Sequence, residues 1–170
     1  MTTPLDGEIE QEGDLKLTSP AFDDGDRMPD SVGYANENEH PPLHVSGVPE
    51  DAESLVLVMD DPDAEAVAGH VWDHWLVYNV DPDTEAIPAG ETPEGAITSY
   101  NDFVEQDWGG PAPPEGEHDY YFKLLALDTT LDYPAGIRKA RLGSAIAMEA
   151  TILAQTQLVG RYDAEQGTAF

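Results

Sequence analysis

Three side chains suited to anion-binding or acid–base chemistry lie near the ends of apolar segments. Asp61 follows the apolar run 54–59, His74 lies inside the run 71–80, and His118 precedes a third apolar run. A histidine donates hydrogen bonds to anions, and it becomes cationic near neutral pH when a carboxylate stands beside it. If neighbouring strands bring these segments together, the three side chains form a small polar pocket.

Further polar groups lie close to these residues in the sequence. Tyr120 shares a strand face with His118, because side chains two residues apart in a strand point to the same side. The backbone amides of the Gly109–Gly110 turn are candidate donors to an oxyanion that need no Lys or Arg. Asp63 follows a proline and is expected to fix that turn through its own backbone.

Several common kinds of site are missing from the sequence. It contains no Gly-X-Ser-X-Gly elbow, no Walker loop and no dinucleotide fingerprint. His70 and His74 have the spacing of a helical metal site, but a strand at about 3.3 Å per residue separates them by roughly 13 Å. His40 and His44 flank two prolines, which exclude a regular helix there. The sequence therefore predicts neither a metal site nor a cofactor.

The elements that position these residues are indicated by apolar runs and by frequent turn residues. The 14 prolines and 15 glycines interrupt the chain at short intervals and favour strands and turns. The runs 54–59, 71–80 and 120–127 have the composition of interior strands. Apolar residues at three-to-four spacing predict a helical segment over 138–160 that ends at a glycine. We expect one domain over 1–170, a mainly β sandwich with one or two C-terminal α-helices.

The charge of the chain restricts its partners. It has 7 Lys and Arg against 35 Asp and Glu, a formal net charge of −28. Nucleic acids and anionic membranes attract clustered Lys and Arg, so both are excluded as electrostatic partners. Such a charge repels itself at low ionic strength, and molar salt shortens the Debye length to about 3 Å. We expect a protein of an extreme halophile; the alternative is an acidic protein that binds a basic partner.

The location of the protein follows from what the sequence lacks. No apolar stretch is long enough to span a membrane, and the acidic residues 1–14 lack the basic-then-apolar pattern of a signal peptide. The whole acidic N-terminal segment, 1–27, is expected to be partly extended. The chain has no Cys, which agrees with a reducing compartment. A cytoplasmic protein without membrane insertion is therefore expected.

Several motifs occur in a characteristic order. They are DDPDA (60–64), VWDHWLVYNV (71–80), NDF (101–103) and GGPAPPEGEHDYYFKLLALD (109–128). Over about residues 28 to 162 the chain resembles the phosphatidylethanolamine-binding protein family, especially its bacterial and archaeal Raf-kinase-inhibitor-like branch. The resemblance implies an antiparallel β-sandwich flanked by helices, with a small pocket for phosphate-like or carboxylate anions.

The resemblance also assigns pocket positions. It implies that the anion-binding residues are Asp61, Trp72, His74, Gly110, His118 and Tyr120. In this assignment His74 and His118 donate to the anion, Gly110 donates through its backbone and Tyr120 through its hydroxyl, while Asp61 orients a histidine and Trp72 lines the rim. This chain has Asp119 where the family commonly has Arg, which should weaken anion capture.

The favoured function is a non-catalytic binding protein for a small anionic or phosphorylated ligand. Regulation of a protein partner and a homodimer are further expectations from the resemblance. One alternative is a hydrolase in which a His and Asp pair acts as general acid and base on an ester or phosphoester through a bound water. A second alternative is a scaffold with a degenerate pocket whose surface carries the function.

Overall fold

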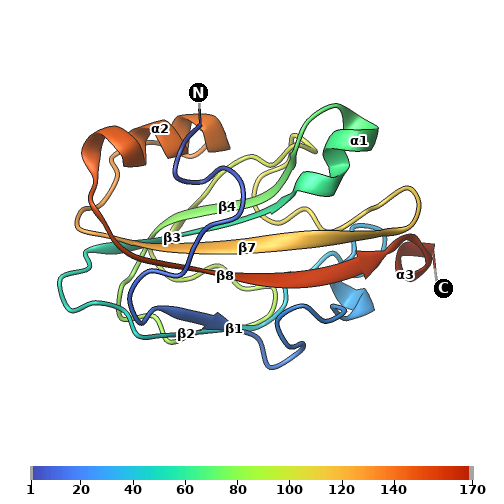
Figure 1. Ribbon diagram of the computed structural model, residues 1–170, viewed down its shortest axis with the longest axis horizontal. Coiled ribbons are helices and arrows are strands. Elements are labelled where there is room, and N and C mark those ends of the chain that lie inside the picture. The colour runs from blue at the N-terminus through green and yellow to red at the C-terminus, as the bar shows by residue number, and fades with distance from the viewer. Residues whose placement is uncertain (1, 169–170) are drawn as a thin grey trace.

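Two antiparallel β-sheets face each other in the computed structural model, which describes residues 2–168 (Figure 1). The five-stranded sheet has the order β6 (Ile97–Thr98), β4 (Trp72–Val80), β3 (Ser54–Asp61), β7 (Glu117–Leu127), β8 (Ile152–Asp163). The three-stranded sheet has the order β1 (Lys16–Thr18), β2 (Leu43–Ser46), β5 (Ala86–Ile87). The helical elements are η1 (Asp30–Val32), η2 (Pro62–Ala64), α1 (Glu65–Ala68), α2 (Lys139–Glu149) and α3 (Ala164–Thr168). The predicted mainly β fold is confirmed.

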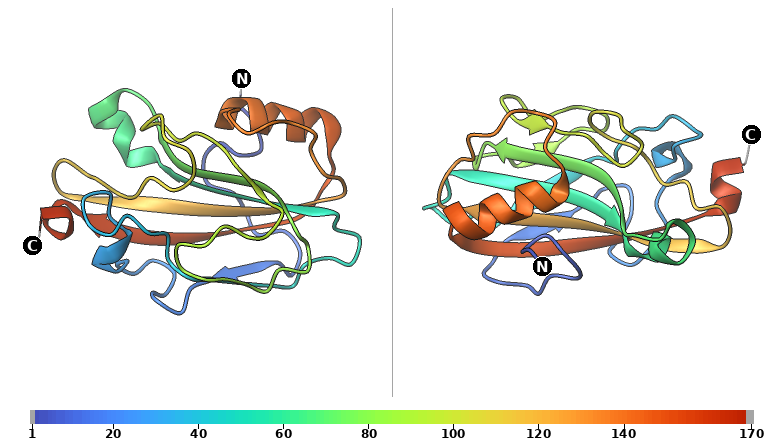
Figure 2. Two further views of the ribbon diagram at one scale, coloured as in Figure 1. Left: turned by 180° about the vertical axis from the view of Figure 1, so that it is seen from behind. Right: turned by 90° about the horizontal axis from the view of Figure 1, so that it is seen from above.

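The five-stranded sheet is buried on both faces. One face packs against the three-stranded sheet through residues such as Leu57, Trp75 and Phe122. The opposite face is covered by α2 and by the N-terminal segment, which Figure 1 shows above the sheet and Figure 2 shows lying across it. Every residue of β3 is buried, which explains why its sequence is a continuous apolar run rather than an alternating one.

The three predicted strands are confirmed, and two of them extend further than the apolar runs. The strand β3 continues through Asp61, and β7 begins at Glu117. Strand β3 lies between β4 and β7, with Asp61 paired to Trp72 and Asp60 paired to Tyr121. This register brings the start of β4, the end of β3 and the start of β7 to one end of the sheet.

The expected helical segment 138–160 is wrong in its second half. The helix α2 ends at Glu149, and the chain then forms β8, which pairs with β7 along almost its whole length. Side chains of β8 alternate between buried and partly exposed, the period of a strand. Gly160 does not end a helix but lies within β8, where a Cβ atom would come within 2.5 Å of the Met28 side chain.

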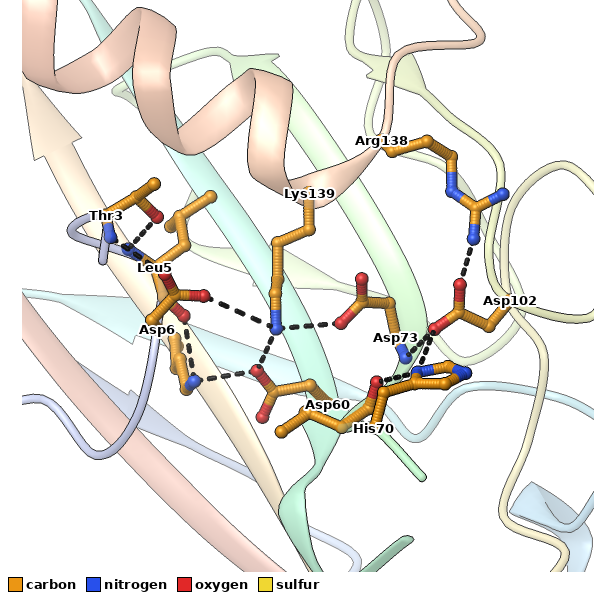
Figure 3. A network of polar contacts seen from close by, with 11 residues as sticks. Thr3, Leu5, Asp6, Asp60, His70, Asp73, Asp102, Arg138 and Lys139 are labelled. Atoms are coloured by element: carbon orange, nitrogen blue, oxygen red, sulfur yellow. Dashed lines mark hydrogen bonds and ion pairs between the residues drawn. The ribbon is translucent and has the colours of Figure 1, made fainter. Parts of the chain in front are cut away.

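A buried charge cluster, formed by Asp60, Asp73, Lys123 and Lys139, fixes α2 and the N-terminal segment to the sheet (Figure 3). Asp60 Oδ2 accepts hydrogen bonds from Lys123 Nζ at 2.7 Å and from Lys139 Nζ at 2.9 Å. Lys139 also pairs with Asp73 at 2.8 Å, and Lys123 donates to the Leu5 carbonyl at 2.9 Å. The two lysines thus face two carboxylates in a largely buried cluster, in which Asp60 is 2% and Asp73 13% exposed.

The two lysines of this cluster differ in their proton affinity. Burial lowers the pKa of Lys123, whose side chain is 1% exposed. Burial acts in the same direction on Lys139, but the carboxylates of Asp60 and Asp73 outweigh it and raise its pKa. Lys139, at the first position of α2, is therefore the firmly charged anchor of the helix.

No helix within residues 2–168 is both long and apolar enough to cross a membrane.

Candidate functional site

A cavity of about 310 Å³ lies at the end of the sheet where β3, β4 and β7 meet. Its lining residues come from the β3 end, η2, α1, β4, the loop between β6 and β7, and the start of β7: Asp61, Ala64, Val67, Ala68, Trp72, His74, Phe103, Ala112, Pro113, Pro114 and His118. Four of the six predicted site residues line it: Asp61, Trp72, His74 and His118. Gly110 and Tyr120 are not in the lining.

Asp61 and His118 form a buried pair across the β3 and β7 strands. The Nδ1 atom of His118 is 2.6 Å from Asp61 Oδ2, and the two side chains are 10% and 4% exposed. The other oxygen, Asp61 Oδ1, is buried without a partner among the described residues. Burial raises the pKa of Asp61, although the hydrogen bond to His118 works against the rise. The predicted orientation of a histidine by Asp61 matches this geometry.

His74 is held in a different way. Its Nδ1 lies 2.6 Å from the carbonyl oxygen of Gly109. A carbonyl only accepts, so Nδ1 carries the proton and Nε2 is left as the ring nitrogen available to the cavity. Burial lowers the pKa of His74 to about 4. His74 is therefore neutral at neutral pH and presents an acceptor, which corrects the expected role of an anion donor.

The glycine turn does not supply free backbone donors. The amide of Gly110 donates to Asn38 Oδ1 at 2.7 Å, and the amide of Gly109 donates to the His74 carbonyl at 2.9 Å. The expected role of Gly110 as a ligand donor is therefore wrong. Its glycine is needed for packing instead, because a Cβ atom would lie 2.0 Å from the carbonyl oxygen of Val32.

Tyr120 lies behind the two histidines rather than in the cavity wall. Its ring is 5.3 Å from that of His74 and 6.3 Å from that of His118, between centroids. It is fully buried, and burial together with the charge of the neighbouring Asp61 carboxylate raises its pKa. The Tyr120 ring therefore packs against both imidazole rings. The predicted donation of its hydroxyl to a ligand does not fit this position, because Tyr120 does not line the cavity.

Trp72 occupies the expected place beside the cavity. Its Nε1 is buried without a hydrogen-bond partner in the part of the chain that the structure describes. One side of the indole stacks on the exposed ring of His70, at 5.4 Å between centroids. Its other aromatic neighbour is Phe103, which also contacts His74 edge-on.

The apolar walls were not predicted from the sequence as ligand contacts. Val67 of α1 is 54% exposed at the cavity, and Phe103 stacks on Tyr34 at 4.1 Å. Isolated small apolar residues in loops carry no signal of their contacts. Ala64, Phe103 and Pro113 lie within the quoted motifs, but nothing in those motifs assigned them to the cavity wall. Asp63 also differs from expectation, because its carboxylate accepts from the backbone amide of Asp119 at 2.8 Å and so ties η2 to β7.

The cavity lining contains no Lys or Arg. Within residues 2–168, no group of three or more His, Asp or Glu side chains is arranged to hold a metal ion. The chemistry open to a molecule in the cavity is therefore that of the two imidazoles and the Asp61 carboxylate, surrounded by apolar side chains.

The assigned state of His74 gives the first testable prediction. We expect its ring nitrogen resonances to show the Nδ1–H tautomer, unchanged between pH 8 and about pH 5, because the pKa lies near 4. The measurement is a pH series of ¹⁵N–¹H correlation spectra in molar KCl. A His74 ring whose nitrogen resonances change between pH 8 and pH 5 would contradict the assignment.

Comparison with known proteins gives a consistent result. The family model for phosphatidylethanolamine-binding protein matches residues 18–163. A UPF0098 protein from Methanothermobacter thermautotrophicus is 41% identical over 153 residues, covering 87% of this chain and 98% of the relative. The crystal structure of a phosphatidylethanolamine-binding protein homologue, CT736, from Chlamydia trachomatis has a TM-score of 0.82 at 34% identity and covers 89% and 99% of the two chains. Escherichia coli YbcL, described as a new member of the mammalian family, has a TM-score of 0.80 at 28% identity, with coverage of 88% and 98%.

Proposed function

We propose that this chain, which belongs to the phosphatidylethanolamine-binding protein family, is a non-catalytic binding protein whose cavity takes a small phosphate-like or phosphorylated anion. One observation carries the proposal: two imidazoles, each with Nδ1 fixed by the protein, lie at one end of a cavity with otherwise largely apolar walls. Such concave, mostly apolar sites with a few fixed polar groups are typical of small-molecule binding.

The binding mode follows from the Asp61–His118 pair. An imidazole that donates Nδ1–H to a carboxylate can carry a second proton on Nε2, and a protonated Nε2 donates to an anion. With both ring nitrogens protonated, His118 beside the Asp61 carboxylate supplies a charged donor within a pair that is neutral overall. His118 is therefore the principal anion contact in this proposal, and Trp72 adds an indole N–H on the same wall.

The test is a titration with inorganic phosphate and phosphorylethanolamine in molar KCl, followed through the ring resonances of His74 and His118. We expect saturating shifts, and a loss of roughly 10- to 100-fold in affinity in His118→Ala, since a hydrogen bond to a charged group contributes about 1.5–3 kcal/mol. The matched control is His44→Ala, on the exposed face of β2, which should bind as the unchanged protein does. Unmoved rings at high ligand would contradict the proposal, as would hydrolysis of phosphorylethanolamine.

The setting and partners are further parts of this proposal. The charge of −28 supports a halophilic protein in a high-salt cytoplasm, within the Raf-kinase-inhibitor-like branch of the family. The sequence resemblance supports a homodimer or a regulated protein partner. Sedimentation of the pure protein in molar KCl measures the oligomeric state, and a single monomer species at all concentrations would remove the homodimer.

A further inference from the structure

The two histidines of the cavity present opposite hydrogen-bonding groups, although they are the same residue type. His74 gives Nδ1–H to a carbonyl, which fixes a neutral ring and leaves Nε2 as an acceptor. His118 shares its Nδ1 hydrogen bond with the Asp61 carboxylate, which can stabilise a doubly protonated ring whose Nε2 donates. Both rings contact Tyr120, so the acceptor and the donor lie at the same end of the cavity.

A ligand that satisfies this end must offer both an acceptor and a donor. A fully deprotonated dianion offers acceptors alone, and its lone pairs would face the lone pair of His74 Nε2. It would also bring two negative charges to a wall without Lys or Arg, next to the buried carboxylate of Asp61. The arrangement therefore disfavours the dianion through hydrogen bonding and through charge.

Few small anions carry a donor near neutral pH. A carboxylate has lost its proton at this pH, since its ordinary pKa is about 4. A phosphodiester has no P–OH at all. A phosphate monoester, with a second pKa of about 6, retains one P–OH group in about a tenth of its molecules at pH 7 and in most of them at pH 5.5. The monoester monoanion is thus the phosphorylated species that matches both rings.

The remaining lining residues of the cavity indicate which kind of group can be attached to the phosphate. Away from the histidines and Asp61, the lining is aromatic and aliphatic: Ala64, Val67, Ala68, Phe103, Pro113 and Pro114. A volume of about 310 Å³ lies at the lower end of the range of roughly 300–1,000 Å³ for cavities that enclose small molecules. The space therefore accommodates an apolar group in addition to the phosphate.

We propose that the cavity selects the singly protonated monoanion of a phosphate monoester with an apolar ester group, over the dianion and over phosphodiesters. The phosphate accepts from Nε2–H of His118, and its P–OH donates to Nε2 of His74. This inference rests on the proposed anion-binding function and specifies its ligand.

The experiment compares phenyl phosphate with methyl phenyl phosphate by calorimetry in molar KCl at pH 5.5 and 7.5. The diester has the same charge as the monoester monoanion but lacks the P–OH group. At pH 5.5 we expect phenyl phosphate to bind at least about tenfold more tightly than the diester, the effect of one hydrogen bond. Between the two pH values the affinity ratio should fall roughly 25-fold, as the monoanion fraction falls for a second pKa near 6.

The ratio of the two affinities separates protonation of the ligand from protonation of the protein, because both ligands bind the same protein at each pH. The charged groups that act electrostatically on the two rings are the same for both ligands at a given pH: Asp60, Asp61, Asp63, Asp102 and Asp119. Equal affinities at pH 5.5, or a ratio that stays constant or rises with pH, would overturn the inference while leaving anion binding intact. If inorganic phosphate binds but neither phenyl ester does, the inference about the apolar ester group is overturned and anion binding stands. If inorganic phosphate also fails to bind saturably, the proposed function itself fails.

A protein variant gives a second readout. In His74→Phe the acceptor is lost and a ring is kept, so we expect the pH dependence of the ratio to weaken to the part caused by charge, while methyl phenyl phosphate still binds through His118. A His74→Phe protein that keeps the full 25-fold change would overturn the role of His74. If this variant does not fold, the comparison of the two esters on the unchanged protein still decides.

Discussion

Replacing Lys123 by methionine is expected to lower the free energy of unfolding by about 3–5 kcal/mol, the usual cost of removing one partner of a buried ion pair. The methionine keeps the length and most of the packing of the side chain. It leaves the buried cluster with two carboxylates and one lysine, and it leaves the Leu5 carbonyl without its donor. Urea denaturation in molar KCl measures the change, because urea does not alter the ionic strength.

The matched control is Lys16→Met, a lysine with an exposed side chain on β1. Its free energy of unfolding should change by less than about 0.5 kcal/mol, since surface substitutions away from special features rarely cost more. In a double-mutant cycle, Asp60→Asn should cost much less in the Lys123→Met background than alone, because the two residues share one interaction. A loss within 1 kcal/mol for Lys123→Met would show that the cluster contributes little to stability.

The central strands were predictable from the sequence because the residue types of each strand reflect whether one or both of its faces are buried. The continuous apolar run before Asp61 requires burial on both faces, and the structure places β3 between two strands and two cores. The structure buries Lys123 within β7, where a charged side chain needs a carboxylate partner. The sequence could not name Asp60 as that carboxylate, because the pairing is set by the register between β3 and β7.

Local composition was misleading where tertiary contacts decide the structure. After Glu149 the residues Ala, Leu and Gln favour a helix, but pairing with β7 and burial of alternate side chains stabilise a strand there. The same limit applies to the site. Asp61, Trp72, His74 and His118 were identified, whereas the donor or acceptor state of each ring depends on what Nδ1 contacts. The contact of His74 Nδ1 with the backbone carbonyl of Gly109 could not be predicted from side-chain types, because it depends on the path of the backbone.

A strong dependence of stability on salt is the second large effect that we expect. Between about 0.1 and 1 M KCl the Debye length falls from about 10 Å to about 3 Å, which screens repulsion among the 35 acidic side chains. The melting temperature should rise steeply over this range, by about 2–4 °C for each kcal/mol gained in a chain of this size. Calorimetry or circular dichroism across a KCl series measures it.

A charge variant separates screening of surface repulsion from general effects of salt on burial. Glu10, Glu50, Glu94 and Glu115 are exposed, so replacing all four by glutamine changes the net charge from −28 to −24. Because repulsion grows with the net charge, this variant should melt higher at 0.1 M KCl and converge with the unchanged protein at molar KCl. Equal melting temperatures across the whole series would mean that repulsion does not limit stability. The acidic surface would then be explained better by a basic partner than by a high-salt environment.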